Sequence, residues 1–392
     1  MKILIISHKA IFPTLDGGSL ATKKIFYDLK KEYKEVDILA LTKKEKEKFS
    51  KFKNQTLFKV NTNFNLLKLV KSFLSTKSYQ TERFYNKNVA KKIIKVINEK
   101  KYNFVLFEGV FPSVYLKDIQ LNCNCKTIIR THNIEHEIWN NLAKNSNNLL
   151  KKLIYFFLKW QMKKWENFIC SKCDFLFCIS KNDQLYFNKI IKKKSEILPV
   201  SFNLKERQKP KEFSIFHLGS MDWKPNIEGV EWFIKKVWFK NFTNNESFKL
   251  YLAGKNMPVF LKNKNNKSLI IESNVESAEN YMLGKSVMIV PIFSGSGIRI
   301  KILEGMSMGI PIISTPKGAQ GIECENKKNI IICKNEFEFI QAIKTIEKDK
   351  NLFTKISQGG RDLIKTHFST EIVIQNWKKL IYENSYHNPK SS

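Results

Sequence analysis

The stretch that decides the fold is residues 290–318, VPIFSGSGIRIKILEGMSMGIPIISTPKG. A short apolar strand, Val287–Pro291, enters a Gly/Ser loop and then a helix whose first turns carry Arg299, Lys301 and Glu304. A second short apolar strand follows. Strand, small-residue loop and helix N-terminus together offer free backbone N–H groups and the positive end of a dipole, which favour a phosphate.

The charged residues of this helix indicate a nucleotide-sugar site. Arg299 and Lys301 place positive charge where a diphosphate would lie. At a rise of about 1.5 Å per residue, Glu304 lies about 10 Å along from Gly297, a suitable position for a carboxylate that binds a ribose diol. The residues alone leave two other interpretations open: a solvated Lys301–Glu304 pair, and an ordinary turn.

The segment resembles the C-domain signature of family 4 (group 1) glycosyltransferases, particularly the bacterial branch that reads G-x-G-x-R-x-K-x-x-E. This resemblance implies the GT-B fold, donor contacts from Gly297 and Ile298, and ribose binding by Glu304. Most of the family has two glutamates eight positions apart. Ser296 stands at the first position, so the resemblance leaves the donor-sugar contact to Ser296, to backbone amides or to other groups.

Length and pattern predict an α/β protein with two domains. A chain of 392 residues exceeds one ordinary core, and strands alternate with helices throughout. Residues 201–212 lack periodicity and mark a linker. The predicted domains are 1–200 with 369–392, and 201–368. The GT-B resemblance implies two Rossmann-like domains facing a cleft, with the C-terminal helix crossing back to the N-terminal domain.

Apolar and β-branched runs predict the secondary structure. Strands are expected at 2–7, 36–41, 103–107, 126–131, 174–180, 195–199, 213–218, 248–253, 268–272, 287–291 and 311–314. Helices are expected at 17–33, 87–99, 134–168, 226–238, 276–283, 336–347, 351–367 and 369–384. The charge run 42–54 is interpreted as a solvated loop or helix end.

Two candidate sites lie in the N-terminal half. Gly17 and Gly18 separate the first strand from the first helix, where glycine allows close approach of backbone to a ligand. The alternative is a tight connection. His132 follows a strand ending at Arg130, where ligands of open α/β sheets usually bind; the alternative is a helix start capped by Asn133. The resemblance places both glycines near the donor phosphates and His132 beside the donor hexose.

The loop 216–226 opens the second domain. Many family members carry an Arg and a Lys here that hold the diphosphate. Ser220 stands where the Arg is expected, and Lys224 is a candidate for the Lys. Arg299 and Lys301 would compensate for the missing Arg. The resemblance also places Gly254, at a strand end, near the nucleotide base.

Composition favours anionic partners. The net charge of +32, from 68 basic and 36 acidic residues, suits phosphates or acidic lipid headgroups. Nucleic acid is not expected, because no zinc-finger spacing or aromatic RNA-binding signature is present. Cys170 and Cys173 have metal-like spacing without a second pair, so buried thiols are favoured over zinc.

Residues 149–169 form a basic, aromatic-rich helical segment. A buried amphipathic helix is the preferred interpretation, because apolar faces usually lie in cores. Peripheral contact with an anionic membrane is the alternative. The first residues are too short an apolar run for a signal peptide, so the expected location is the cytoplasm, with contact at the inner face of the plasma membrane as the further hypothesis.

The resulting functional hypothesis is a retaining glycosyltransferase. It would move a hexose from a nucleotide diphosphate sugar to a glycan or lipid-linked acceptor in cell-surface polysaccharide synthesis, with no cofactor or metal. His132, Arg299, Lys301 and Lys224 are the candidate catalytic residues. A GT-B sugar-nucleotide epimerase and a non-catalytic GT-B partner subunit are the alternatives; Ser296 is the feature that keeps the second open.

Overall fold

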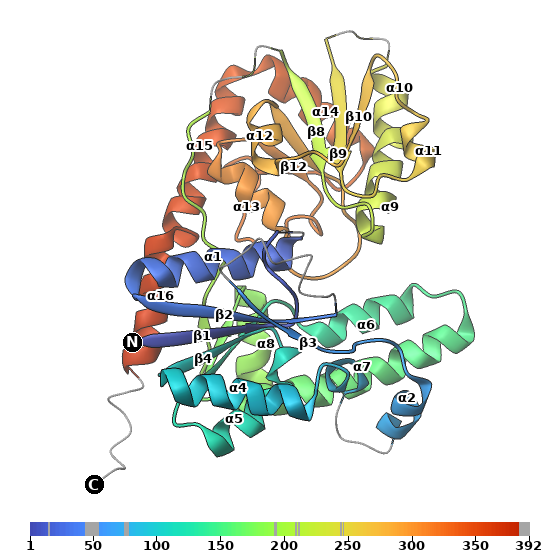
Figure 1. Cartoon of the computed structure of the whole chain (residues 1–392). Coiled ribbons are helices and arrows are strands. Elements are labelled where there is room, and N and C mark those ends of the chain that lie inside the picture. The colour runs from blue at the N-terminus through green and yellow to red at the C-terminus, as the bar shows by residue number, and fades with distance from the viewer. Residues whose placement is uncertain are drawn as a thin grey trace. The chain divides into compact units, whose positions relative to one another are not determined.

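The computed structural model divides into two compact units, residues 1–201 with 370–392, and residues 202–369 (Figure 1). The boundaries expected from sequence lie one residue earlier. The described residues are 1–14, 16–43, 55–73, 78–191, 194–207, 210, 212–243, 245 and 247–383.

Among the described residues, the first unit contains one parallel sheet in the order β3-β2-β1-β4-β5-β6-β7. Its strands are β1 (Lys2–Ser7), β2 (Glu35–Thr42), β3 (Thr56–Lys59), β4 (Phe104–Glu108), β5 (Lys126–Thr131), β6 (Phe175–Cys178) and β7 (Glu196–Ile197). The central strands are almost wholly buried and apolar, as expected for a parallel sheet that is covered on both faces.

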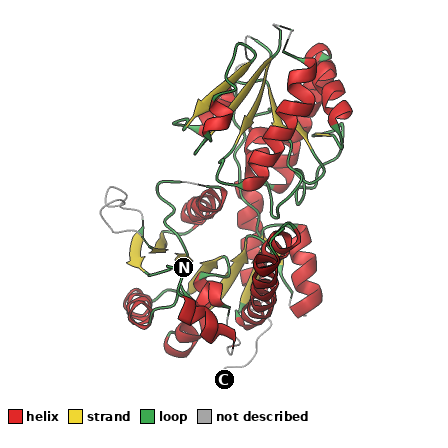
Figure 2. Ribbon diagram, turned by 90° about the vertical axis from the view of Figure 1, so that its right-hand side faces the viewer, coloured by secondary structure: helices red, strands yellow, loops and turns green. Residues whose placement is uncertain are grey.

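Helices cover both faces of this sheet (Figure 2). They are α1 (Gly17–Glu32), α2 (Leu66–Phe73), α3 (Tyr79–Glu82), α4 (Lys87–Lys100), α5 (Leu116–Asn122), α6 (Glu135–Lys144), α7 (Leu149–Lys172), α8 (Lys181–Ile191) and α16 (Thr370–Glu383). The C-terminal α16 joins this unit: Trp377 packs parallel to Phe177, and Thr370 Oγ1 donates to Asp28 Oδ1 at 3.0 Å. The return of the last helix to the N-terminal domain is therefore confirmed.

The second unit repeats the architecture. In the part of the chain that the structure describes, its parallel sheet has the order β10-β9-β8-β11-β12-β13. The strands are β8 (Ser214–Leu218), β9 (Lys249–Gly254), β10 (Leu269–Ser273), β11 (Val287–Val290), β12 (Ile312–Ser314) and β13 (Ile331–Ile332). The helices are α9 (Lys224–Phe233), which continues as a π turn at Ile234–Trp238, α10 (Phe239–Asn241), α11 (Val259–Lys262), α12 (Ala278–Leu283), α13 (Ile300–Ser307), α14 (Glu336–Lys348) and α15 (Lys350–His367).

Both sheets have Rossmann-type strand order, which confirms the predicted fold class. In each, the order reverses between the first and fourth strands, β1/β4 and β8/β11. Ligands of open α/β sheets bind outside the carboxyl ends of the strands at this point. Each unit therefore has one edge where a site is expected.

The sequence prediction differs from the structure in one long helix and in several short elements. The single helix expected over 134–168 is two helices, α6 and α7, broken at residues 145–148 and packed side by side (Figure 1). Asn148 caps α7, because its side chain accepts a hydrogen bond from Lys151 N at 2.9 Å. β3 was also missed. Most of the charge run at 42–54 lies outside the described residues.

Candidate functional site

The main candidate site lies where the second sheet reverses its strand order. The loop 291–299 leaves β11 and leads into α13, while the loop 219–223 leaves β8 and leads into α9. Gly295 and Gly297 adopt positive φ angles of 94° and 80°, which only glycine takes easily. These glycines turn the chain sharply into the N-terminus of α13.

Arg299 is wrapped inside its own loop. It is only 5% exposed, and its Nη1 donates to the carbonyls of Ser296 at 2.6 Å and Gly297 at 2.7 Å. The guanidinium carbon lies 4.7 Å from the ring centre of Trp223, a cation–π contact. Burial lowers the pKa of Arg299 to about 10. The positive charge is thus fixed at the helix start.

Lys301 reaches inward from the first turn of α13. Its Nζ donates to Asn226 Oδ1 at 3.0 Å and to Leu218 O at 3.1 Å, and lies 3.3 Å from His217 Nε2. His217 Nδ1 lies 3.0 Å from the Ile289 carbonyl. A carbonyl can only accept, so Nδ1 carries the proton and Nε2 accepts from Lys301. Burial, and then the charge of Arg299, lower the pKa of Lys301 to about 7.

This cluster has positive charge without a balancing carboxylate. Among the described residues, neither Arg299 nor Lys301 forms an ion pair, and Arg299 Nε is buried with no hydrogen-bond partner. The first turn of α13 carries no acidic residue, although acids are favoured at that end of a helix. Buried cations and a helix dipole that reinforce one another are costly unless an anion binds them. The arrangement is that of an anion site.

Two glycines allow the strand ends to approach closely. A Cβ on Gly254 would lie 1.7 Å from the Gly219 carbonyl oxygen, and a Cβ on Gly219 would lie 3.0 Å from Lys301 Nζ. Gly254 also has a φ of 153°. The end of β9 therefore supports the β8 loop, which in turn leaves room for the lysine.

Gly254→Ala is expected to destabilise the protein by about 3 kcal/mol, from the clash and the unfavourable φ. Gly284→Ala is the matched control. Its φ is −84°, and its added Cβ would meet nothing nearer than Tyr281 O at 3.9 Å, so its effect should stay within about 0.5 kcal/mol. Urea unfolding measures both; equal midpoints would contradict the close approach at Gly254.

The remaining predicted donor residues of this unit fall into two groups. Ser296, Gly297, Ile298 and Glu304 lie half-buried in the loop and on α13 with the cluster. Lys224 lies apart from it: its side chain is 72% exposed and pairs with Glu228 at 3.3 Å along α9. The structure thus brings Lys301 to the strand end and leaves Lys224 on the helix surface.

The first unit holds a buried charged network at its own strand reversal. Glu108 ends β4 and is wholly buried, with both carboxylate oxygens 3.2 Å from Arg130 Nη1. Arg130 is also wholly buried and donates to the carbonyls of Leu198 and Pro199. Thr22 Oγ1 donates to Glu108 at 3.0 Å. Burial alone would raise the pKa of Glu108, but Arg130 and His132 lower it to about 2.

His132 is held by this network. Its Nε2 lies 2.7 Å from Glu108 Oε2, and its side chain is 12% exposed. Because the carboxylate accepts, Nε2 carries the proton, and Nδ1 is an acceptor in the neutral ring. His8, which directly follows β1, is half-buried, and desolvation of its ring together with Lys9 and His132 lowers its pKa to about 3. His8 is therefore neutral near pH 7 and adds no charge beside His132.

The glycines of the first loop lie at the start of α1. Asp16 caps this helix by accepting from Ser19 N at 2.8 Å, and it pairs with Lys9 Nζ at 2.8 Å. A Cβ on Gly18 would lie 2.9 Å from Lys9 Nζ, so Gly18 leaves space for this pair, and Gly17 is the first residue of the helix. Lys9 thereby places a cation at the edge that carries His132.

Three carboxyl groups lie in the helices that follow β5 and β6: Glu135, Glu166 and Asp183. Glu166 is buried and accepts from Glu135 N and lies against His136 Nδ1, each at 2.7 Å. Burial, and then Glu166, raise the pKa of Glu135 to about 8. Burial likewise raises the pKa of Asp183 to about 6. Glu135 is therefore a neutral acid near pH 7.

Glu135→Gln is expected to stabilise the protein increasingly as pH rises. The folded state holds the Glu135 proton up to about pH 8, whereas the unfolded chain releases it near pH 4.5, so wild type loses stability across that window. The variant should gain about 1–3 kcal/mol relative to wild type between pH 5 and 8. Chemical unfolding at several pH values measures this. Glu137→Gln, on the exposed side of α6, is the control; parallel profiles for wild type and Glu135→Gln would refute the prediction.

Several site residues escaped sequence reasoning. Glu108 was not singled out, because its role depends on residues distant in sequence, and Trp223 was given no role although it lies in the loop 216–226. Asn226, His217 and Gly219 belong to the loop 216–226 that the sequence singled out, but the partner expected there was Lys224. Arg130 was noted only as the end of a strand.

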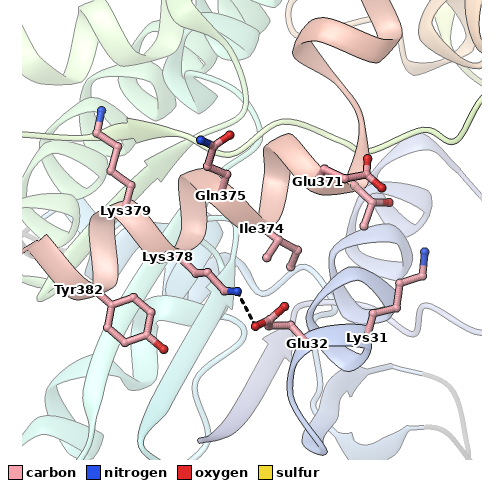
Figure 3. A pocket seen from close by; sticks show the side chains of 9 residues that line it. Lys31, Glu32, Glu371, Ile374, Gln375, Lys378, Lys379 and Tyr382 are labelled. Atoms are coloured by element: carbon pink, nitrogen blue, oxygen red, sulfur yellow. Dashed lines mark ion pairs between the residues drawn. The ribbon is translucent and has the colours of Figure 1, made fainter.

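Other features lie apart from these edges. A pocket of about 860 Å³ lies between the C-terminal end of α1 and α16, where Lys378 pairs with Glu32 (Figure 3). Asp16 and Gly17 are at the opposite end of α1. All seven cysteines are free thiols. The described residues include no group of three or more His, Cys, Asp or Glu placed to hold a metal, and none of their helices is long and apolar enough to cross a membrane.

Comparison with known proteins finds similar sequences. Residues 212–349 match the family model described as glycosyl transferases group 1. An uncharacterized 44.6 kDa protein in the cps region of Klebsiella pneumoniae is 24% identical over 396 residues, covering 96% of this chain and 98% of that protein.

Solved structures extend the likeness to the whole chain. Sucrose-phosphate synthase from Thermosynechococcus elongatus has a TM-score of 0.71 at 11% identity, covering 99% of this chain and 100% of that one. HepE of Anabaena in complex with UDP has a TM-score of 0.68 at 11% identity, covering 98% and 100%; its complex with UDP-glucose has a TM-score of 0.65 at 11% identity with the same coverage. The fold is GT-B, and the matches together support a glycosyltransferase.

Proposed function

We propose that this chain is a retaining glycosyltransferase that moves a hexose from a nucleotide diphosphate sugar to a glycan or lipid-linked acceptor. The observation that carries the proposal is the pair of cations at the N-terminus of α13, the buried Arg299 and the half-buried Lys301, neither of which has a carboxylate partner among the described residues. A diphosphate is the anion that suits two neighbouring basic side chains and a helix dipole.

The roles follow from these positions. Lys301 and Arg299 stabilise the negative charge that develops on the diphosphate as the glycosidic bond breaks, and because they are already in place, little reorganisation is needed. Glu304, on α13, binds the ribose diol, and Ser296 and Gly297 lie at the sugar end of the donor. His132, oriented by Glu108, accepts a hydrogen bond from a sugar hydroxyl through Nδ1.

In the proposed mechanism the acceptor hydroxyl attacks the anomeric carbon from the same face that the diphosphate leaves. The leaving diphosphate takes the proton of that hydroxyl, and the anomeric configuration is retained. The side chains then supply position and charge stabilisation rather than a strong base. We assign no step to a metal, because Arg299 and Lys301 provide the positive charge. Lys224 would contribute only if its ammonium left Glu228.

The donor and the pathway are proposed from relatives. HepE binds UDP and UDP-glucose, which supports a UDP-hexose as the first donor to test. The Klebsiella relative in a cps region supports a role in cell-surface polysaccharide synthesis. A cytoplasmic location agrees with seven free thiols, which persist in reducing compartments.

The test is mass spectrometry of donor hydrolysis and transfer over a panel of UDP-, GDP- and ADP-sugars. We expect the wild-type protein to turn over one class of donor. The Glu304→Ala variant should turn over that donor about a hundredfold more slowly. If a donor binds without turnover, the chain is a non-catalytic partner subunit. No binding of any sugar nucleotide, with Glu304→Ala unchanged, would overturn the proposal.

A further inference from the structure

The first half of α7 exposes a continuous apolar face. Leu149, Leu153, Phe156 and Trp160 recur at helical spacing, and they are 73%, 59%, 39% and 48% exposed. Leu150 extends this face and is 68% exposed. The preferred sequence interpretation, an amphipathic helix whose apolar face is buried, is therefore wrong for this half of α7.

The opposite side of the same helix accounts for its place in the core. Leu158, Met162, Trp165 and Ile169 are buried, and three of them pack in the main core of the first unit. Burial on that side leaves the side chains of Leu149, Leu153, Phe156 and Trp160 largely exposed. Large contiguous apolar faces on a soluble protein mark a binding surface.

Lysines are interleaved with the aromatic residues of this face. Lys164 Nζ lies 3.8 Å from the ring centre of Trp160, and Lys159 Nζ lies 5.8 Å from that of Phe156. α7 carries six lysines and one acid, and that acid, Glu166, is buried against His136. The exposed side of α7 is thus apolar and cationic, with no carboxylate.

We propose that the face formed by Leu149, Leu153, Phe156 and Trp160, with Lys159, Lys163 and Lys164, lies on an anionic membrane surface. Apolar side chains would enter the interface while lysine ammonium groups reach lipid phosphates, as in interfacial amphipathic helices. Charge argues against a second copy of the chain as the occupant, since it would bring the same lysines on a molecule of net charge +32. The inference holds whatever reaction the site performs.

The test is flotation of the full chain with vesicles of phosphatidylcholine alone, or with about a third phosphatidylglycerol. We expect binding only to the anionic vesicles, weakening as salt rises. Lys163→Gln with Lys164→Gln should reduce binding about tenfold, and Trp160→Ala with Leu153→Ala at least as much. Two control variants remove exposed residues of the same kinds elsewhere in the unit: Lys91→Gln with Lys92→Gln on α4, and Leu185→Ala on α8. Both should bind the vesicles as wild type does.

Two readouts keep the result unambiguous. Circular dichroism and UDP-sugar binding of the α7 variants should match wild type, so that failure of this inference and failure of the donor site are distinguishable. Flotation that is absent at low salt, or equal in the α7 variants and the controls, overturns the proposal. A change in oligomeric state of the α7 variants without lipid dependence would instead assign the face to self-association.

Discussion

Lys301→Met is expected to weaken binding of the sugar-nucleotide donor by about 10²–10³-fold, because truncating one partner of a charge pair that the bound ligand would bury typically costs about 2–5 kcal/mol. Methionine keeps the apolar stem and removes only the charge. Titration calorimetry with UDP-glucose and with UDP measures the loss. Lys240→Met, on the surface of the same unit, is the matched control and should bind as wild type does.

The pH dependence of binding follows from the same lysine. Its pKa is about 7 in the free protein, and a bound diphosphate raises it, so binding above pH 7 takes up a proton. Donor affinity should therefore fall by up to about tenfold per pH unit between pH 7 and 9. UDP-glucose is the suitable probe, because its doubly esterified diphosphate does not titrate there. A flat profile in wild type, or one that survives in Lys301→Met, would contradict this assignment.

Glu108→Ala is expected to destabilise the protein by about 3–5 kcal/mol, the range for removing one partner of a buried ion pair. Arg130 would remain wholly buried, with its Nη1 deprived of the carboxylate 3.2 Å away. The urea midpoint measures the change. Glu99→Ala is the control, since Glu99 forms an exposed pair with Lys95 at 3.7 Å and should contribute less than about 1 kcal/mol.

A double variant separates the ion pair from packing. Glu108→Leu with Arg130→Met removes both charges, and buried pairs replaced by apolar residues often recover stability. We expect the double variant to be more stable than Glu108→Ala while losing the orientation of His132. If the loss of stability in the double variant equals the sum of the losses in Glu108→Leu and in Arg130→Met measured separately, the two charges are not coupled as described.

The loop and helix start that form the proposed donor site could be located from sequence because their signal is local. The strand, the Gly/Ser loop and the helix start of residues 290–318 are contiguous, and small residues followed by Arg299 and Lys301 carry the chemistry in order. The depth of Lys301 could not be predicted. It depends on His217 and Asn226, which come from another loop, and on Gly219, whose missing side chain makes room for the ammonium.

The Glu108–Arg130–His132 network of the first unit shows more clearly what cannot be predicted from sequence. His132 was predicted from its place at a strand end, but Glu108 lies in a run of apolar residues, where a carboxylate has no recognisable partner. The role of Glu108 becomes evident only when β4 and β5 pair and place Arg130 beside its carboxylate. The α7 error has a similar cause: helical periodicity identifies an apolar face but not what covers it.

The most direct test of the central claim is calorimetric titration of UDP into wild type and Lys301→Met, with Lys240→Met alongside. If the buried cations of α13 hold a nucleotide diphosphate, wild type and Lys240→Met bind UDP equally, and Lys301→Met binds at least about a hundredfold more weakly. Equal binding by all three, or no binding of UDP, GDP or ADP by wild type, would contradict the account.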